Sequence, residues 1–177
     1  MKALVVYESM YGNTRMIAEA VADGLRPDYD VEVLDVAKAT AATAADVDLL
    51  VVGGPTHVHG MSRPATRRSA VEAASKPDSG LTVEPDADGR GVREWLGFLA
   101  QGEGTPAAAF DTRLSAPAIM TGRASAGIAK RLRRLGFSRA CEPAGFLVDK
   151  QSHLLPDQLD KARQWGRQIA EAATAAK

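Results

Sequence analysis

Short apolar runs alternate along the chain with stretches in which apolar residues recur every three or four positions. The first run is Ala-Leu-Val-Val-Tyr at residues 3–7, and later runs lie around residues 31–34, 49–52, 107–110 and 146–148. Short Val- and Leu-rich runs that end at Ser, Gly or Pro are typical of strands buried on both faces. The pattern therefore predicts five strands.

Helical spacing follows these runs. Met16, Ile17, Ala20, Val21 and Leu25 recur on one face after Asn13 and predict the first helix. The sequence predicts further helices in the Ala- and Thr-rich stretch before residue 49, after Pro64, around 92–99, around 128–135 and from about Pro156 to Ala173. Alternating strands and helices favour an α/β sandwich with a mostly parallel sheet, because right-handed crossovers place helices on both faces.

The length of 177 residues suits one domain, residues 1–177. Within it, Pro, Gly and Asp gather between Lys76 and Gly91, so we expect an inserted surface excursion at about residues 76–105. Trp95 and Trp165 occupy core-like helix positions and are assigned to packing.

Composition excludes several classes of protein. Lys plus Arg and Asp plus Glu number 22 each, so no net charge attracts nucleic acid. Cys141 is the only cysteine, which excludes an intrachain disulfide and a Cys cluster for a metal. No run reaches the roughly 20 apolar residues of a membrane span. We expect a cytoplasmic protein that binds neither nucleic acid nor membrane.

The loop after the first strand is the strongest functional signal. Ser9, Met10, Tyr11, Gly12, Asn13 and Thr14 join a buried strand to a helix. Main-chain N–H groups at a helix start lack intrahelical partners and suit a phosphate, and Gly12 permits a close approach. No lysine is present to reach a second phosphate, so a monophosphate is expected. The alternative is that Ser9, Asn13 and Thr14 only cap the helix.

This strand, the sequence Ser-x-Tyr-Gly-Asn-Thr and the following helix resemble the phosphate loop of flavodoxins, usually Ser/Thr-x-Thr-Gly-Asn-Thr. Tyr11 replaces the usual Thr, and Ser-Met-Tyr-Gly is also similar to the flavodoxin-like NAD(P)H:quinone oxidoreductases. The resemblance covers nearly the whole chain in element order. It implies FMN as cofactor and a flavodoxin-like three-layer sandwich, with a five-stranded parallel sheet of order 2-1-3-4-5.

The loop after the third strand is Gly53 to Met61, and its Gly-Pro-Thr-x-x-x-Gly-Met core resembles that of the quinone oxidoreductases. The resemblance implies that Pro55, Thr56, His57, Val58, His59 and Gly60 cover one flavin face. Flavodoxins generally stack an aromatic ring there, whereas this chain has His57, which would leave the face more open.

His57 and His59 have two further interpretations. A metal is rejected because no third ligand or Cys pair stands at suggestive spacing. Either histidine could instead donate to a flavin carbonyl or move protons, since an imidazole titrates near neutrality. The catalytic residues are otherwise unassigned.

The loop after the fourth strand contains Phe110, Asp111, Thr112 and Arg113. The resemblance implies that its main-chain amides contact the second flavin face and the pyrimidine edge. The plain alternative for Asp111 and Arg113 is a surface ion pair worth under about 1 kcal/mol. The basic cluster from Lys130 to Arg139 is expected to be a solvated helix face, with an acidic docking partner as the sharper interpretation.

The leading functional hypothesis is FMN-dependent electron transfer or reduction, with a redox partner protein or a small acceptor such as a quinone. Carrier flavodoxins are typically strongly acidic, and the balanced charge of this chain argues against a low-potential carrier. One alternative is an NAD(P)H-dependent FMN quinone reductase. The other is a non-enzymatic flavin-binding or flavin-free interaction module.

Overall fold

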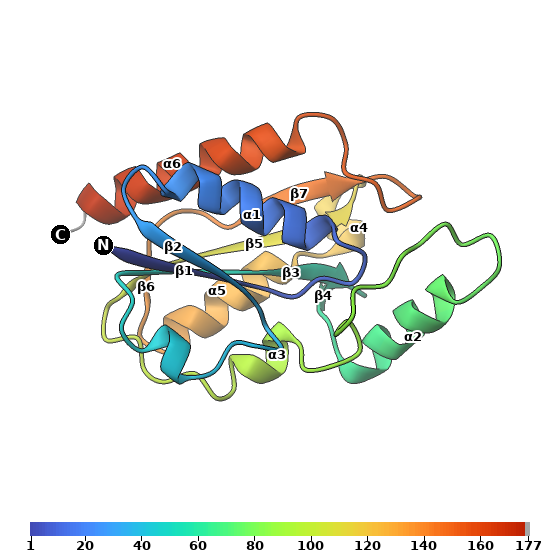
Figure 1. Ribbon diagram of the computed structural model, residues 1–177, viewed down its shortest axis with the longest axis horizontal. Helices are drawn as coiled ribbons and strands as arrows, with labels where there is room; N and C mark the ends of the chain where they lie inside the picture. The colour runs from blue at the N-terminus through green and yellow to red at the C-terminus, as the bar shows by residue number, and fades with distance from the viewer. Residues whose placement is uncertain (176–177) are drawn as a thin grey trace.

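A parallel sheet forms the middle layer of the protein, which we describe from a computed structural model for residues 1–175 (Figure 1). Its main strands run in the order β2-β1-β3-β5, and two further strands share the edge beyond β5. The short β6 pairs with the beginning of β5, and β7 pairs with its end. The strands are β1 (Lys2–Tyr7), β2 (Asp30–Asp35), β3 (Leu49–His57), β5 (Pro106–Leu114), β6 (Ser138–Arg139) and β7 (Ala144–Val148).

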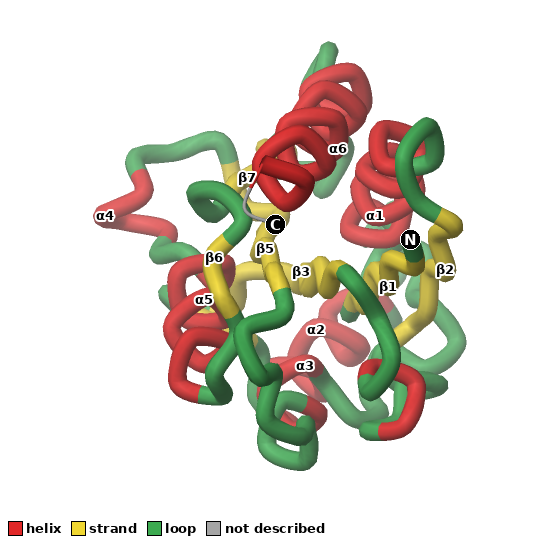
Figure 2. The backbone as a smooth tube through the Cα atoms, turned by 90° about the vertical axis from the view of Figure 1, so that its left-hand side faces the viewer, coloured by secondary structure: helices red, strands yellow, loops and turns green. Residues whose placement is uncertain are grey.

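Helices cover both faces of the sheet (Figure 2). The helices α1 (Asn13–Leu25) and α6 (Gln158–Ala175) pack together on one face, and α5 (Ala124–Arg134) and α3 (Val92–Trp95) lie on the other. Each face has its own apolar core, and the side chains of β1 alternate between them: Val5 belongs to the first core, and Leu4 and Val6 belong to the second. The three-layer α/β sandwich with the predicted strand order is thus confirmed.

Shorter elements gather between and beyond the strands. A 3₁₀ turn (Ala42–Ala44) precedes β3, and the two-residue β4 (Gly60–Met61) folds back on the end of β3. Helix α2 (Pro64–Ala74) lies beyond the carboxyl end of the sheet, and α4 (Ala118–Thr121) follows β5. The apolar pattern did not predict β4, β6 or α4, which contain only two to four residues.

Two strands continue beyond their predicted ends. The run at residues 49–52 was expected to stop at Gly53-Gly54-Pro55, but β3 extends to His57 and Pro55 pairs with Thr112 of β5. Residues 111–113, expected in a loop, belong to β5. The prediction was wrong there because glycine and proline are tolerated where neighbouring strands supply the pairing.

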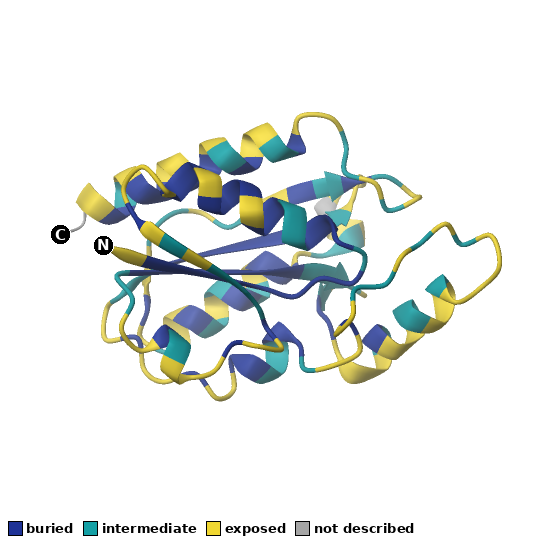
Figure 3. Ribbon diagram, in the orientation of Figure 1, coloured by how far each residue is buried: buried dark blue, intermediate teal, exposed yellow. Residues whose placement is uncertain are grey.

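The segment at residues 76–105 has two different halves (Figure 3). Residues 76–83 are mostly exposed and contain no helix or strand. From Glu84 onward the chain returns to the body of the protein: the Glu84 N–H donates to the Met10 carbonyl at 2.9 Å, and Trp95, Leu96 and Leu99 are buried under the sheet. The second half therefore completes one of the two cores.

The packing roles of both tryptophans are confirmed. Trp95 is buried in the core beneath α3, and Trp165 forms edge-to-face contacts with Phe110 and Phe146 on the opposite face. Ring pairs of this geometry stabilise a core by about 0.5 to 1.5 kcal/mol beyond the area they bury. Within residues 1–175, no helix combines the length and apolar character of a membrane span.

Candidate functional site

A cavity of about 310 Å³ opens where the carboxyl ends of the parallel strands meet. Ligands bind α/β sheets of this kind at that edge. The loops after β1 and β7 and the last residues of β3 and β5 contribute to its wall, and α2 contributes Ala70. The lining residues are Met10, Tyr11, Asn13, Thr14, Pro55, Thr56, His57, Ala70, Thr112, Arg113, Leu114, Val148, Lys150 and Ser152.

The loop from Ser9 to Thr14 presents main-chain donors to this cavity. Gly12 has a φ of +87°, a left-handed conformation that favours glycine, and its N–H donates to the Ser9 hydroxyl at 3.1 Å. The N–H groups of Tyr11, Asn13 and Thr14 have no acceptor among residues 1–175. Such donors are unsatisfied in the first turn of a helix and attract an anion.

The side chains of this loop connect the walls of the cavity. Tyr11 donates its hydroxyl to the Ala70 carbonyl of α2 at 2.8 Å. The Asn13 side-chain amide donates to the Ser152 carbonyl at 2.6 Å, and the Thr14 and Thr112 hydroxyls lie 2.8 Å apart. Only one proton of that hydroxyl pair lies between the two oxygens, so the other hydroxyl can donate into the cavity. The loop thus braces the walls of the cavity and presents free main-chain N–H groups to it.

The segment after Thr56 divides between two cavities. Pro55, Thr56 and His57 line the cavity just described, whereas Val58, His59 and Gly60 turn away from it and line a neighbouring one. The segment predicted to cover one flavin face therefore divides at His57, which lines both cavities.

Val58 and His59 form the two-residue turn between β3 and β4, with φ of +43° and +71°. Such turns favour Asn-Gly, and a β-branched residue in this conformation is strained by about 1 to 3 kcal/mol. A Cβ atom on Gly122 would lie 2.2 Å from the His59 carbonyl oxygen, so glycine is required there for α4 to approach the turn. Val58 is 81% exposed at the tip. The turn is thus a strained, accessible feature beside the cavity.

The surroundings of His57 favour the neutral imidazole. Burial lowers the pKa of His57, and the nearby Arg67 charge lowers it further, while contact with the Thr66 main chain opposes the shift. A neutral imidazole can both donate and accept a hydrogen bond, and it can take up a proton from a reacting group.

The residues at the end of β5 have separate roles. Phe110 lies in the core and its side chain does not line the cavity, whereas Thr112 and Arg113 do. Asp111 is fully buried and accepts hydrogen bonds from the Ser125 N–H at 2.9 Å and the Ser125 hydroxyl at 2.6 Å. Arg113 pairs with Asp111 at 3.0 Å. The expectation of a surface ion pair was therefore wrong, because α5 begins directly over the carboxylate and covers it.

Sequence reasoning missed the contribution of the loop after β7. Lys150 and Ser152 line the cavity, and Ser152 receives the hydrogen bond from Asn13. Their position after the last strand was the available signal, because carboxyl-end loops of one parallel sheet converge. Lys150 and Arg113 are the charged side chains among the lining residues, and no acidic side chain is among them.

The metal hypothesis was rejected from the sequence. Across residues 1–175, no three His, Cys, Asp or Glu side chains lie close enough together to hold a metal ion.

Comparison with known proteins agrees with this architecture. The family model of the flavodoxin domain matches residues 4–68, which include most of β1, the loop from Ser9 to Thr14 and the turn at Val58 and His59. The chain has the flavodoxin-like fold. No curated protein sequence matches it significantly.

Solved structures similar to this flavodoxin-like chain span nearly all of it. A flavodoxin from the domain Archaea is 22% identical with a TM-score of 0.67, covering 98% of this chain and 99% of its own. Oxidised Flavodoxin 1 from Bacillus cereus is 18% identical with a TM-score of 0.67, covering 97% and 98%. A WrbA-like flavodoxin from Agrobacterium tumefaciens is 20% identical with a TM-score of 0.59, covering 99% of both chains. These likenesses establish the fold.

Proposed function

We propose that this protein binds FMN in the 310 Å³ cavity and uses it for electron transfer or for the reduction of a small acceptor. The observation that carries the proposal is the set of unpaired N–H groups at Tyr11, Asn13 and Thr14, placed at the start of α1 and at the cavity wall. They would hold the phosphate, since an anion at a helix start also gains from the helix dipole.

The remaining lining suits the flavin ring system. Pro55 and His57 of β3 and Thr112, Arg113 and Leu114 of β5 line the cavity side by side, so a planar group would lie against the paired ends of these two strands. The volume lies at the lower end of the usual range for small-molecule sites, about 300 to 1,000 Å³. Flavodoxins typically bind FMN, which when bound supplies reversible one- or two-electron chemistry.

The charges around the cavity favour a reductase over an acidic electron carrier. Lys150 would stabilise negative charge on a reduced flavin, whereas acidic surroundings would oppose it; the Arg113 charge is already paired with Asp111. His57 would take up or release the accompanying proton. This supports the NAD(P)H-dependent quinone reductase as the second candidate function, with a quinone or a redox partner protein as acceptor.

The decisive experiment is a paired titration of flavin-free protein with FMN and with riboflavin, followed by flavin fluorescence. FMN should bind at least about tenfold more tightly, because each hydrogen bond to a charged group contributes about 1.5 to 3 kcal/mol. Equal affinity for the two would overturn the phosphate assignment. Absence of binding by both would leave a flavin-free interaction module on the same fold.

The reductase is tested separately. NAD(P)H oxidation in the presence of a quinone should require bound FMN. If flavin-loaded protein accepts electrons only from a protein donor, the function is that of a carrier, and the second candidate is wrong.

A further inference from the structure

A second cavity, of about 360 Å³, lies on the far side of the β3–β4 turn from the proposed flavin cavity. It is enclosed by the turn, the beginning of α2 and α3, and His57 lines both cavities. The lining residues are His57, Val58, His59, Gly60, Met61, Arg63, Thr66 and Arg93. Arginine and histidine supply the ionisable side chains in this lining, and acidic side chains are not part of it.

Neither arginine of this cavity forms an ion pair with a carboxylate in the part of the chain that the structure describes. Arg63 is exposed, and no acidic partner for its guanidinium occurs in residues 1–175. Arg93 donates through Nε to the Ser62 carbonyl at 2.9 Å and through a terminal nitrogen to the Met61 carbonyl at 2.7 Å, which are neutral acceptors. Burial lowers the pKa of Arg93, and the positive charges of Arg131 and Arg63 lower it further, while the negative charges of Glu94 and Glu8 oppose the shift. Positive charge is thus concentrated here.

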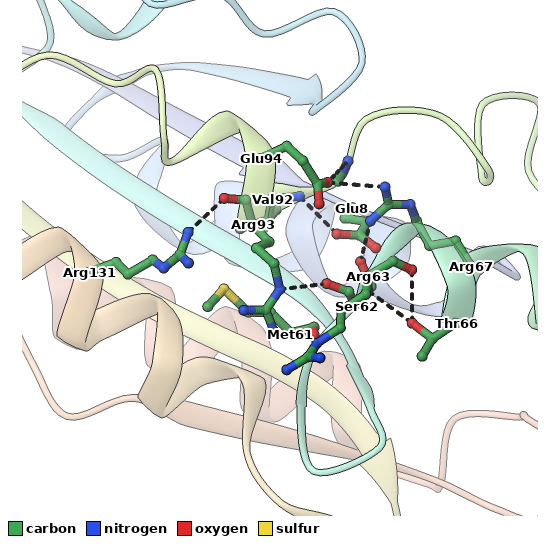
Figure 4. A network of polar contacts seen from close by, with 11 residues as sticks. Glu8, Met61, Ser62, Arg63, Thr66, Arg67, Val92, Arg93, Glu94 and Arg131 are labelled. Carbon is green, nitrogen blue, oxygen red and sulfur yellow. Dashed lines mark hydrogen bonds and ion pairs between the residues drawn. The ribbon is translucent and has the colours of Figure 1, made fainter.

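The nearby carboxylates are engaged elsewhere (Figure 4). Glu94 accepts from the Gly91 N–H at 2.9 Å and pairs with Arg67 at 3.0 Å. Glu8 is buried and accepts from the Val92 N–H at 2.8 Å. These bonds leave the Glu8 and Glu94 carboxylates on the Arg67 side of the network.

The cationic groups are also held in place. Arg67 is 2% exposed and donates to the Ser62 hydroxyl at 2.8 Å, which fixes the chain between the turn and α2. Arg131 of α5 donates to the Arg93 carbonyl at 2.7 Å. The Thr66 hydroxyl accepts from the Arg63 N–H at 2.9 Å at the beginning of α2. The Arg93 guanidinium and the main chain at Arg63 are thus held in place, and a preorganised donor loses little entropy when it binds a ligand.

We propose that this cavity binds the phosphate or carboxylate group of a small redox substrate, with Arg63 and Arg93 as its ligands and His57 as the wall shared with the flavin cavity. Guanidinium groups bind both oxyanions through paired hydrogen bonds. The redox role of the substrate rests on the proposed flavin function, whereas oxyanion binding does not.

Oxyanion binding is tested on flavin-free protein by calorimetric titration with pyrophosphate and, separately, with citrate at constant ionic strength. Arg63→Gln should weaken binding about tenfold or more, as expected when a charged hydrogen-bond donor is lost. Arg68→Gln is the matched control, because Arg68 is exposed on α2, which begins directly after Arg63, and does not line the cavity. Pyrophosphate or citrate binding that depends on Arg63 supports the site and identifies the preferred group.

Several results would overturn the inference. Absence of binding by both pyrophosphate and citrate would contradict it. An equal loss of affinity in Arg63→Gln and Arg68→Gln would contradict it as well. Arg93→Lys tests the second ligand while retaining a positive charge, and circular dichroism checks that the variant is folded. Failure of FMN to bind while pyrophosphate binding persists would remove the proposed function and keep the oxyanion site.

The substrate role is tested on flavin-loaded protein with two quinones, one bearing a carboxylate and one uncharged. Arg63→Gln should raise KM about tenfold for the charged quinone and not for the uncharged one, since only the charged quinone carries a group for Arg63 to bind. Equal KM changes for both quinones would contradict the substrate role.

Discussion

The two cavities on either side of His57 offer negative groups different partners. The proposed flavin cavity presents main-chain N–H groups from Tyr11, Asn13 and Thr14, while the neighbouring cavity presents the guanidinium groups of Arg63 and Arg93. Main-chain donors depend on backbone conformation and tolerate side-chain changes. Guanidinium donors depend on side chains held by a buried network. Different mutations should therefore weaken the binding of a negative group in each cavity.

The largest expected effect is on the network behind the arginine cavity. Arg67→Met should lower the free energy of unfolding by about 3 kcal/mol, because removing one partner of a buried charge cluster leaves the other groups unpaired. Chemical denaturation measures the loss, with exposed Arg68→Met as the control. If Arg67→Met lowers the free energy of unfolding by no more than Arg68→Met does, the network does not hold the cavity.

In the flavin cavity the expected loss is of affinity and not of fold. Thr14→Ala should weaken FMN binding by about 1.5 to 3 kcal/mol, about 10- to 150-fold, because a hydroxyl donor to the phosphate is removed. Riboflavin, which lacks the phosphate, should bind unchanged in the same fluorescence titration, and Thr14→Ser should restore FMN binding. Equal losses of affinity for FMN and for riboflavin would contradict the contact between the Thr14 hydroxyl and the phosphate.

A smaller effect is expected at the shared wall. His57→Trp should tighten oxidised FMN by about 0.5 to 1.5 kcal/mol, the usual value of an aromatic pair, if His57 leaves the flavin face open. Fluorescence titration measures the change. Unchanged affinity would mean that residue 57 does not face the flavin ring.

The smallest effect is a pH dependence of stability. Because the folded-state pKa of His57 is lowered, the unfolded chain takes up a proton first as pH falls below about 6.5. The contribution of His57 is thus fully present above that pH and declines as pH falls toward the folded-state pKa. His57→Gln should reduce this slope in denaturation curves between pH 5 and 7.5. A steeper dependence of stability on pH in the variant would mean that the folded state favours the charged imidazole.

The sequence predicted the parts of the molecule that are continuous along the chain. The five strands follow from apolar runs, and the free main-chain N–H groups at the cavity follow from Ser9 to Thr14, where one loop supplies the donors. Its cofactor contacts remain predictions, as do those of the loops after β3 and β5.

The second cavity could not be predicted in this way. Arg63, Arg93 and Arg131 are distant in sequence, and charged residues are almost always expected at the surface, so the burial of Glu8 and Arg67 gave no sequence signal. Asp111 was expected at the surface for the same reason. Lys150 was overlooked because it carries no motif and is recognisable only once β7 lies beside β5.

The division of the 76–105 segment has a practical consequence. Gly80 has open space around it, whereas the chain from Glu84 onward is anchored beneath the sheet. Limited proteolysis near Gly80 should therefore yield two fragments that stay together in gel filtration, since each contributes strands to one sheet. The protein could then be expressed as two complementing halves, with reassembly reported by the return of flavin binding.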